Sequence, residues 1–204
     1  MMLAMRQRGF SLVELMVAVA ILALLIVAAM PSLGTWLENT RIRNEGDSLV
    51  NGLQTARAEA VRRNQNVSFW LVHLPDPAKL DNTCTQSTTG TDGSWVVSVS
   101  NPGSHCGDDP LSTTSNTSGI VVGRAMGSDS AHVSVTALQS GGTAGSSVTF
   151  NGFGRVAGTG SIAEIDLDGT GGSTYRKLNV MVSTTGAVRM CDPLVTSSTD
   201  PRKC

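Results

Sequence analysis

The pattern of hydrophobic and polar positions is dominated by a long apolar run near the N-terminus. From Phe10 to Met30 the only charged residue is Glu14. In a helix these 21 residues would extend about 30 Å, which is the thickness of the hydrocarbon core of a bilayer. We therefore predict a membrane-spanning helix over 10–31. Because carboxylates inside membranes are rare and usually paired, we expect Glu14 to meet a partner group.

Beyond Pro31 the chain becomes polar but keeps a helical period. Leu49, Leu53, Ala56 and Ala60 recur at helical spacing and form one apolar stripe. This pattern predicts that the helix continues over 32–65 as an amphipathic segment whose stripe packs on a globular domain. Three arginines lie off the stripe and are expected on a solvated face: Arg57, Arg62 and Arg63.

The remainder, 66–204, alternates short apolar runs with turn signals such as Asn-Gly, Asp-Gly and Gly-Gly. The expected strands are 66–72, 95–99, 119–122, 131–135, 147–150, 162–167, 177–182 and 187–190. Residues 81–118 contain few core-forming side chains outside the second of these and are expected to form a long loop region. The predicted fold class is α+β, with a long N-terminal helix packed on an antiparallel, β-sandwich-like head.

Composition and charge place this head outside the cytoplasm. The 204-residue chain has a formal net charge of −1, so no overall basicity indicates a nucleic-acid partner. Arg6 and Arg8 precede the apolar run, and the positive-inside rule puts them in the cytoplasm and the head on the other side. Without residues 1–9 the chain has 13 basic and 16 acidic residues, a net charge of −3.

The four cysteines are Cys84, Cys106, Cys191 and Cys204. An even number in an exported domain indicates two disulfides, and three pairings are possible. Pairing of nearest neighbours would give one disulfide inside the loop region and one that closes the C-terminal tail. The chain-entropy relation assigns a tail loop of that length about 3 kcal/mol. No Cys-x-x-Cys spacing or adjacent histidine favours a metal site instead.

No combination of residues indicates catalysis. His73, His105 and His132 are scattered, and no nucleophile stands in a recognisable context. Asp166 begins a sequence with a faint likeness to a calcium loop, but Lys177 occupies the position where an EF-hand needs Glu. Asp168-Gly169 is therefore interpreted as a hairpin turn. We expect no enzyme activity, no cofactor and no metal.

The N-terminal segment closely resembles the class III signal of type IV pilins and pseudopilins. Gly9, Phe10 and Glu14 match that signal position by position, and Pro31 matches a proline that often bends the family's helix. The resemblance implies that a prepilin peptidase cleaves after Gly9 and that Phe10 is N-methylated. It also implies that Glu14 pairs with the terminal amine of a neighbouring subunit. A secretory signal peptide or a plain signal anchor would leave Glu14 unexplained.

Two downstream segments resemble the FimT/FimU/GspH group of minor pilins and pseudopilins. Residues 56–64 are similar to the end of that group's helix, and 186–193 are similar to its final strand. DNA-binding members carry Gly-Arg-x-Arg in this strand, whereas this chain has Gly186, Ala187 and Arg189. Arg189 is thus a candidate DNA contact, and the alternative is that it supports the tail loop.

The resemblance implies a pilin fold and a structural role. Residues 1–9 would be the cleaved leader. The expected function is that of a minor pilin in the assembly or tip-initiation complex of a type IV pilus. One alternative is an H-type pseudopilin of type II secretion, and another is a pilus DNA receptor for natural transformation. Its partners would be other pilins or pseudopilins, the prepilin peptidase and the inner membrane. The protein would reside there as a single-pass protein with a periplasmic head before joining the pilus or pseudopilus.

Overall fold

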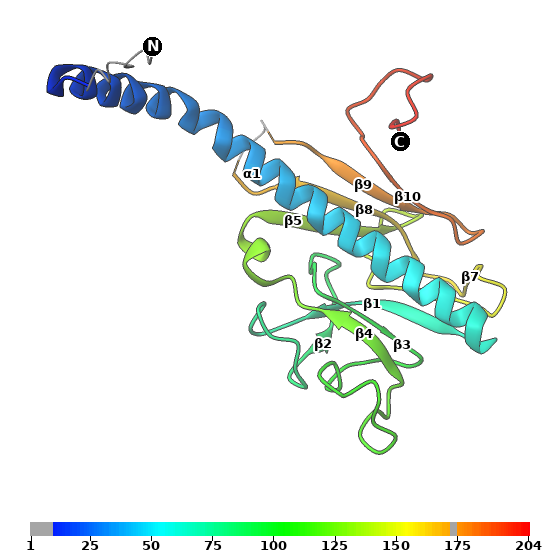
Figure 1. Ribbon diagram of the computed structural model, residues 1–204. Coiled ribbons are helices and arrows are strands. Elements are labelled where there is room, and N and C mark those ends of the chain that lie inside the picture. Colours follow the sequence, from blue (N-terminus) through cyan, green and yellow to red (C-terminus); the bar gives the residue numbers. More distant parts are fainter. Residues whose placement is uncertain (1–9, 172–174) are drawn as a thin grey trace, which may run out of the picture. The chain divides into compact units, whose positions relative to one another are not determined.

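The structure is a computed structural model that describes residues 10–171 and 175–204, without the side chains of 28–32. The described residues form one long helix and ten strands (Figure 1). The helix, α1, spans Leu12–Arg63. Contacts between Cα atoms divide the chain into two units, with the boundary between Leu37 and Glu38. The second unit therefore contains the C-terminal part of α1 together with all the strands.

Ten short strands follow the helix, separated by turns and longer loops. They are β1 (Val67–His73), β2 (Thr85–Gln86), β3 (Trp95–Ser98), β4 (Ile120–Arg124), β5 (Val133–Gln139), β6 (Ser147–Phe150), β7 (Val156–Ala157), β8 (Ile162–Gly169), β9 (Leu178–Val182) and β10 (Val188–Cys191). A 3-10 helix, η1, occupies Gly127–Ala131.

The strands form two antiparallel sheets. One has the order β4-β3-β1-β6-β7, with β2 paired to β1, and the other has the order β10-β9-β8-β5. A backbone hydrogen bond of 3.2 Å from Val156 N–H to Thr184 O connects the edge of the first sheet to the turn between β9 and β10. The structure thus has the predicted fold class, a long helix on antiparallel sheets.

The apolar stripe of α1 lies in the core, as the sequence pattern predicts. Leu49, Leu53, Ala56 and Ala60 are completely buried and share one cluster with side chains of both sheets. Phe69 and Trp95 contribute rings to this cluster, with centroids 5.7 Å apart. Burial of this stripe against both sheets, rather than helix propensity alone, stabilises the C-terminal part of α1.

Two glycines allow α1 to approach the sheets closely. A Cβ added to Gly46 would lie 2.7 Å from Met190 Sδ, and one added to Gly52 would lie 2.8 Å from the ring of Phe69. Each glycine lowers the intrinsic stability of the helix by up to about 1 kcal/mol relative to alanine. Both positions are buried, so the close packing of helix on sheet accounts for these glycines.

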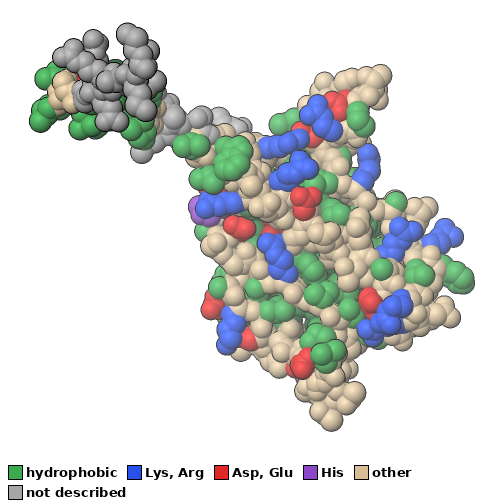
Figure 2. Space-filling model, viewed as in Figure 1, with side chains coloured by type: hydrophobic (Ala, Val, Ile, Leu, Met, Phe, Trp, Pro, Cys, Tyr) green, Lys and Arg blue, Asp and Glu red, His purple; other side chains and the backbone are tan. Residues whose placement is uncertain are grey.

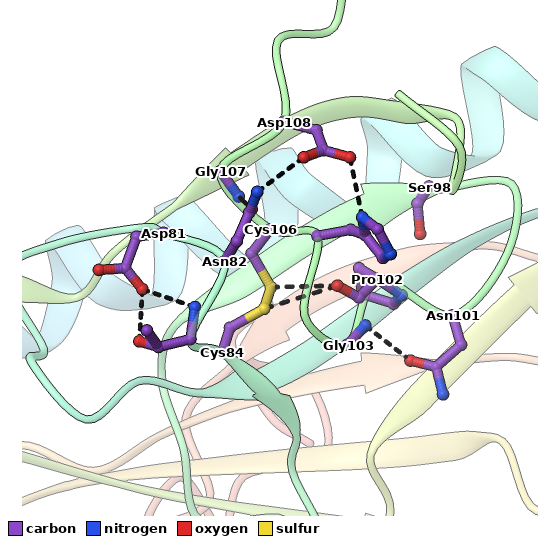
Figure 3. The surroundings of a disulfide bond; sticks show 12 residues. Asp81, Asn82, Cys84, Ser98, Asn101, Pro102, Gly103, Cys106, Gly107 and Asp108 are labelled. Atoms are coloured by element: carbon purple, nitrogen blue, oxygen red, sulfur yellow. Dashed lines mark hydrogen bonds and ion pairs between the residues drawn. A yellow bond between two sulfur atoms is a disulfide. The ribbon is translucent and has the colours of Figure 1, made fainter. Parts of the chain in front are cut away.

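The loop region between β1 and β4 is more ordered than the sequence indicates. The Cys84–Cys106 disulfide lies in a second buried cluster with Val72, Val96 and Ile120, at the surface of the first sheet (Figure 3). The two half-cystines therefore supply the core-forming groups that this segment otherwise lacks.

Polar contacts brace this loop beside the disulfide. Asn82 donates a 2.8 Å side-chain hydrogen bond to Asp108, whose carboxylate also contacts His105 at 3.1 Å (Figure 3). Asn82 Oδ1 accepts a further 2.8 Å hydrogen bond from the backbone N–H of Gly107. Together these bonds hold the two ends of the disulfide-closed segment side by side.

Most strand ends lie one or two residues from their expected positions, β5 ends four residues later than expected, and four further details differ from the structure. The strands β2 and β7 were not expected, and each has only two residues, too few for a pattern of alternation. The strand expected from Ala131 begins at Val133, because Ala131 ends η1. Asp168-Gly169 is not itself the turn of the β8–β9 hairpin, because both residues remain in β8, paired with β5.

Candidate assembly segment and tail loop

The N-terminal part of α1 exposes an apolar surface along its whole circumference. All residues from Phe10 to Val27 are exposed, including Phe10 at 83%, Leu12 at 73% and Leu24 at 72%. An exposed apolar surface of this length is typical of segments that contact lipid or other protein chains. The predicted cleavage position, Gly9, lies outside the described residues.

Glu14 occupies the first turn of α1, where it has a local role. Ser11 precedes the helix, and its side-chain oxygen accepts a 3.2 Å hydrogen bond from the backbone N–H of Glu14. A serine N-cap followed three residues later by glutamate is the sequence of a capping box. The carboxylate also lies where the helix dipole favours a negative charge. Any substitution of Glu14 therefore affects helix initiation as well as contacts with neighbouring chains.

Within the part of the chain whose side chains are described, no helix is long and apolar enough to cross a membrane. The predicted span over 10–31 includes residues 28–31, whose side chains lie outside that description. The predicted bend at Pro31 falls among them and stays a prediction.

A buried ion pair, which the sequence did not reveal, connects α1 to the first sheet. Glu45 is completely buried, and its Oε2 accepts a 2.8 Å hydrogen bond from Arg124 Nη1 at the end of β4. Its other oxygen, Oε1, is buried without a hydrogen-bond partner among the described residues. Burial raises the pKa of Glu45 above its ordinary value, although the adjacent Arg124 acts in the opposite direction.

Arg57 fastens the last turns of α1 to the turn between β6 and β7, so its expected place on a solvated face is only partly right. Its Nε donates a 2.9 Å hydrogen bond to Gly154 O, in the turn between β6 and β7. Gly186, in the turn between β9 and β10, lies against the same oxygen, because an added Cβ would clash with it. Gly186 also has a φ of 83°, which favours glycine.

Arg62 and Arg63 do lie on a solvated face, where both donate hydrogen bonds to Glu59. The hydrogen bonds from Arg62 lower the pKa of Glu59 to about 2, against the effect of partial desolvation and with a smaller contribution from the Arg63 hydrogen bond. These three residues form a local charge network on one side of the helix.

The C-terminal tail forms a closed loop around Arg189. A disulfide joins Cys191 to Cys204, which is the nearest-neighbour pairing, with a Cα–Cα distance of 5.1 Å. Arg189 Nη1 donates a 3.2 Å hydrogen bond to Lys203 O, and Nη2 donates one of 3.1 Å to Cys204 O. The exposed Arg189 side chain is thus bound to the tail, the arrangement expected if it supports the loop.

The histidines do not gather into one site. His73 contacts Asp92, His105 contacts Asp108 and His132 contacts Glu38, each on a different part of the head. Among the described residues, no group of three or more histidines, cysteines or carboxylates is arranged to hold a metal ion.

The sequence matches two protein-family models, one over the head and one over the N-terminal segment. The model of the family described as type II transport protein GspH matches residues 45–186, more than half of the chain. The chain belongs to the GspH family. Its N-terminal segment, residues 4–30, also matches the prokaryotic N-terminal methylation motif. This member of the GspH family is therefore pilin-like, of the general class of minor pilins and pseudopilins, whose members are structural subunits.

Solved structures similar to this GspH-family chain include the type IV minor pilin FimU of Pseudomonas aeruginosa strain PAO1 in two crystal forms. The first is 15% identical, with a TM-score of 0.45, and the match covers 83% of this chain and 98% of that chain. The second is 16% identical, with a TM-score of 0.41, covering 79% and 98%. Comparison with curated proteins returns no match.

Proposed function

We propose that the protein is a minor pilin, a structural subunit that joins the assembly or tip-initiation complex of a type IV pilus. The observation that carries this proposal is the exposed apolar surface of 10–27, which contains the single charge of Glu14. Such a surface needs lipid around it before assembly and the helices of other subunits afterwards. The head, held on α1 by its buried stripe, would remain outside the helical bundle.

In this proposal Glu14 pairs with the N-terminal amine of a neighbouring subunit. The leader would be removed after Gly9, so that N-methylated Phe10 begins the mature chain. An α-amine titrates near pH 8 and is largely cationic at neutral pH. Inside an apolar bundle an unpaired carboxylate and an unpaired ammonium are each costly, whereas the pair is tolerated. The match to the methylation motif supports this processing.

An H-type pseudopilin of type II secretion is the second candidate, and the match to the family of type II transport protein GspH favours it. The disulfide-closed tail loop supports the pilus instead, because many pilins close a C-terminal loop in this way. Deletion of the gene separates the two candidates: the pilus role predicts loss of surface pili with intact secretion. Loss of type II secretion with normal piliation would establish the pseudopilin role.

The DNA-receptor alternative receives less support. Arg189 already donates to two tail oxygens, and Ala187 stands where DNA-binding members have an arginine. We therefore do not assign DNA binding to this strand.

Two substitutions of Glu14 test the assembly role. Glu14→Gln keeps a residue that a capping box accepts and removes the charge, whereas Glu14→Ala removes both. We expect both variants to reach the inner membrane and both to be reduced or absent in sheared pili. Immunoblots of membrane and pilus fractions measure this.

Ser11→Ala is the matched control, because it removes the cap seen at the Glu14 N–H and leaves the carboxylate in place. It should assemble better than Glu14→Gln. If Glu14→Gln enters pili as well as the wild type while Ser11→Ala does not, Glu14 serves helix capping and the pairing role is wrong.

A further inference from the structure

Three arginines from separate parts of the chain converge on a small pocket beside the tail loop. Arg43 of α1, Arg176 before β9 and Arg202 of the tail line a pocket of about 250 Å³. Its other walls are Leu178, Met190, Cys191 and Asp192. Figure 2 shows Lys and Arg side chains gathered with a few acidic ones near the C-terminal loop.

Backbone packing fixes the position of this pocket. The absence of a side chain at Gly46 lets Met190 lie against α1, so the end of β10 passes one helical turn from Arg43. On the other side, the backbone N–H of Asp192 donates a 2.7 Å hydrogen bond to Arg202 O. The Cys191–Cys204 disulfide closes the same loop. The tail therefore holds Arg202 over the end of β10.

The acidic side chain that lines the pocket, Asp192, accepts hydrogen bonds from within the chain. Asp192 Oδ1 accepts a 3.0 Å hydrogen bond from the Leu194 N–H, and Oδ2 accepts a 3.5 Å bond from Arg176 Nη2. The Asp192 side chain is only 13% exposed. It thus supports Arg176 and the tail, and the positive charge of Arg176 offsets its negative charge.

The arginines keep unused donors around the pocket. Arg202 donates Nε and Nη2 to Asp200, which leaves Nη1 without a partner in the described chain. Among the described residues, the ion-pair partner of Arg43 is Asp47, 3.8 Å from Nε, and both side chains are more than half exposed. Such an exposed pair is weak and yields readily to a better anion.

We infer that this pocket binds a phosphate group. Guanidinium forks that approach from three elements suit an anion with acceptor oxygens in several directions, whereas a single fork satisfies a carboxylate. The pocket is smaller than the 300–1,000 Å³ typical of sites for drug-sized ligands, so it fits one phosphate and a few adjoining atoms. The phosphate group could be a free phosphate ester or the headgroup of a phospholipid.

The tail disulfide is part of this site, because it keeps Arg202 in place. Reduction of Cys191–Cys204 releases the last residues of the chain and removes one of the three guanidinium groups. Phosphate binding should therefore be lost, or weakened as much as by substitution of Arg202, when the disulfide is reduced.

Isothermal titration calorimetry of the full chain in detergent micelles tests the site. The probes are inorganic phosphate and glycerophosphoglycerol, a phospholipid headgroup, at constant ionic strength. We expect saturable binding that Arg43→Gln and Arg202→Gln each weaken about tenfold or more, the effect of a lost charged hydrogen bond. Arg62→Gln is the matched control, because its side chain is 65% exposed, similar to Arg202 at 64%, and should bind as the wild type does.

The source of the phosphate follows from the two probes. Tighter binding of glycerophosphoglycerol assigns the site to a phospholipid headgroup, and tighter binding of inorganic phosphate assigns it to a small free ester. Near-UV circular dichroism verifies that each variant is folded. Any of the following results would overturn the inference: no saturation by either probe, equal weakening in Arg62→Gln, or equally tight binding of acetate. Binding of duplex DNA without saturable binding of either probe would also contradict the inference. It would indicate a diffuse basic surface in place of a phosphate pocket.

Discussion

The buried pair of Glu45 and Arg124 gives the sharpest prediction about stability. Glu45 is completely buried, and within the described chain its carboxylate has one side-chain partner, Arg124, at 2.8 Å. Arg124→Ala would leave a buried carboxylate without a counter-charge. Removing one partner of a buried pair typically costs about 3–5 kcal/mol. Because the Arg124 side chain is 36% exposed, water screens part of the interaction and we expect the lower value, about 3 kcal/mol.

This loss can be followed by thermal unfolding of the full chain in detergent micelles. For a folded unit of this size 3 kcal/mol corresponds to a fall in Tm of about 6–12 °C. Tryptophan fluorescence in a Trp36→Phe/Trp70→Phe background is a suitable signal, because it then comes from Trp95. The Trp95 indole N–H donates a 2.9 Å hydrogen bond to Ser48 of α1 and reports on the contact between helix and sheet. The double variant Glu45→Gln/Arg124→Ala should recover most of the loss, since no charge remains buried.

The same pair predicts a pH dependence. A carboxyl group whose pKa is raised in the folded state contributes stability that is fully present below its unfolded pKa, about 4.3, and is lost as pH rises through the folded pKa. Burial raises the pKa of Glu45 in this way. In Arg124→Ala the opposing effect of the arginine is gone, so the pKa rises further. The difference in Tm between wild type and variant should therefore shrink as pH falls from 7 towards 4.

The reasoning is refuted if Arg124→Ala lowers Tm by no more than the exposed control Arg62→Ala, with the same pH dependence as wild type. Glu45 would then be accommodated without its partner, for example by water at Oε1.

Three other expectations concern packing, the tail and Arg57. Gly52→Ala should lower the free energy of unfolding by about 1 kcal/mol, because a clash with the rings of Phe69 and Trp95 outweighs the gain in helix propensity. Gly34→Ala is the control and should not destabilise the protein, because no described atom lies within 4 Å of the added Cβ. Both free energies are measured by denaturant unfolding. Non-reducing peptide mapping should find Cys84 linked to Cys106 and Cys191 to Cys204; a Cys84–Cys191 peptide would contradict this pairing. Arg57→Ala should increase amide hydrogen exchange in the turn at Gly154 and leave exchange in β3 unchanged, since the lost hydrogen bond lies at that turn. Equal exchange at Gly154 in the wild type and in Arg57→Ala would show that Arg57 is not needed there.

Much of the fold follows from local pattern. The apolar stripe of α1 could be predicted because all its members face one side at helical spacing. Most strands could be found because β-branched and aromatic residues cluster between turn residues, and β6 has the expected bounds.

The contacts between distant segments could not be predicted in the same way. Glu45 has the sequence context of a solvated helix residue, and its partner lies 79 positions away. Gly46 and Gly52 look like helix-weakening residues until the side chains of β10 and the first sheet are placed against them. Arg57 is indistinguishable from Arg62 by residue type, and only the position of Gly154 O separates their roles.

The measurement that bears most directly on the assembly role is mass spectrometry of sheared pili compared with inner membranes. The account predicts that the pilus fraction contains this chain beginning with N-methylated Phe10, and that the Glu14→Gln chain is reduced or absent there while its mature form is present in the membrane fraction. A chain that retains residues 1–9 in pili, or a Glu14→Gln chain present there at the wild-type level, would contradict it.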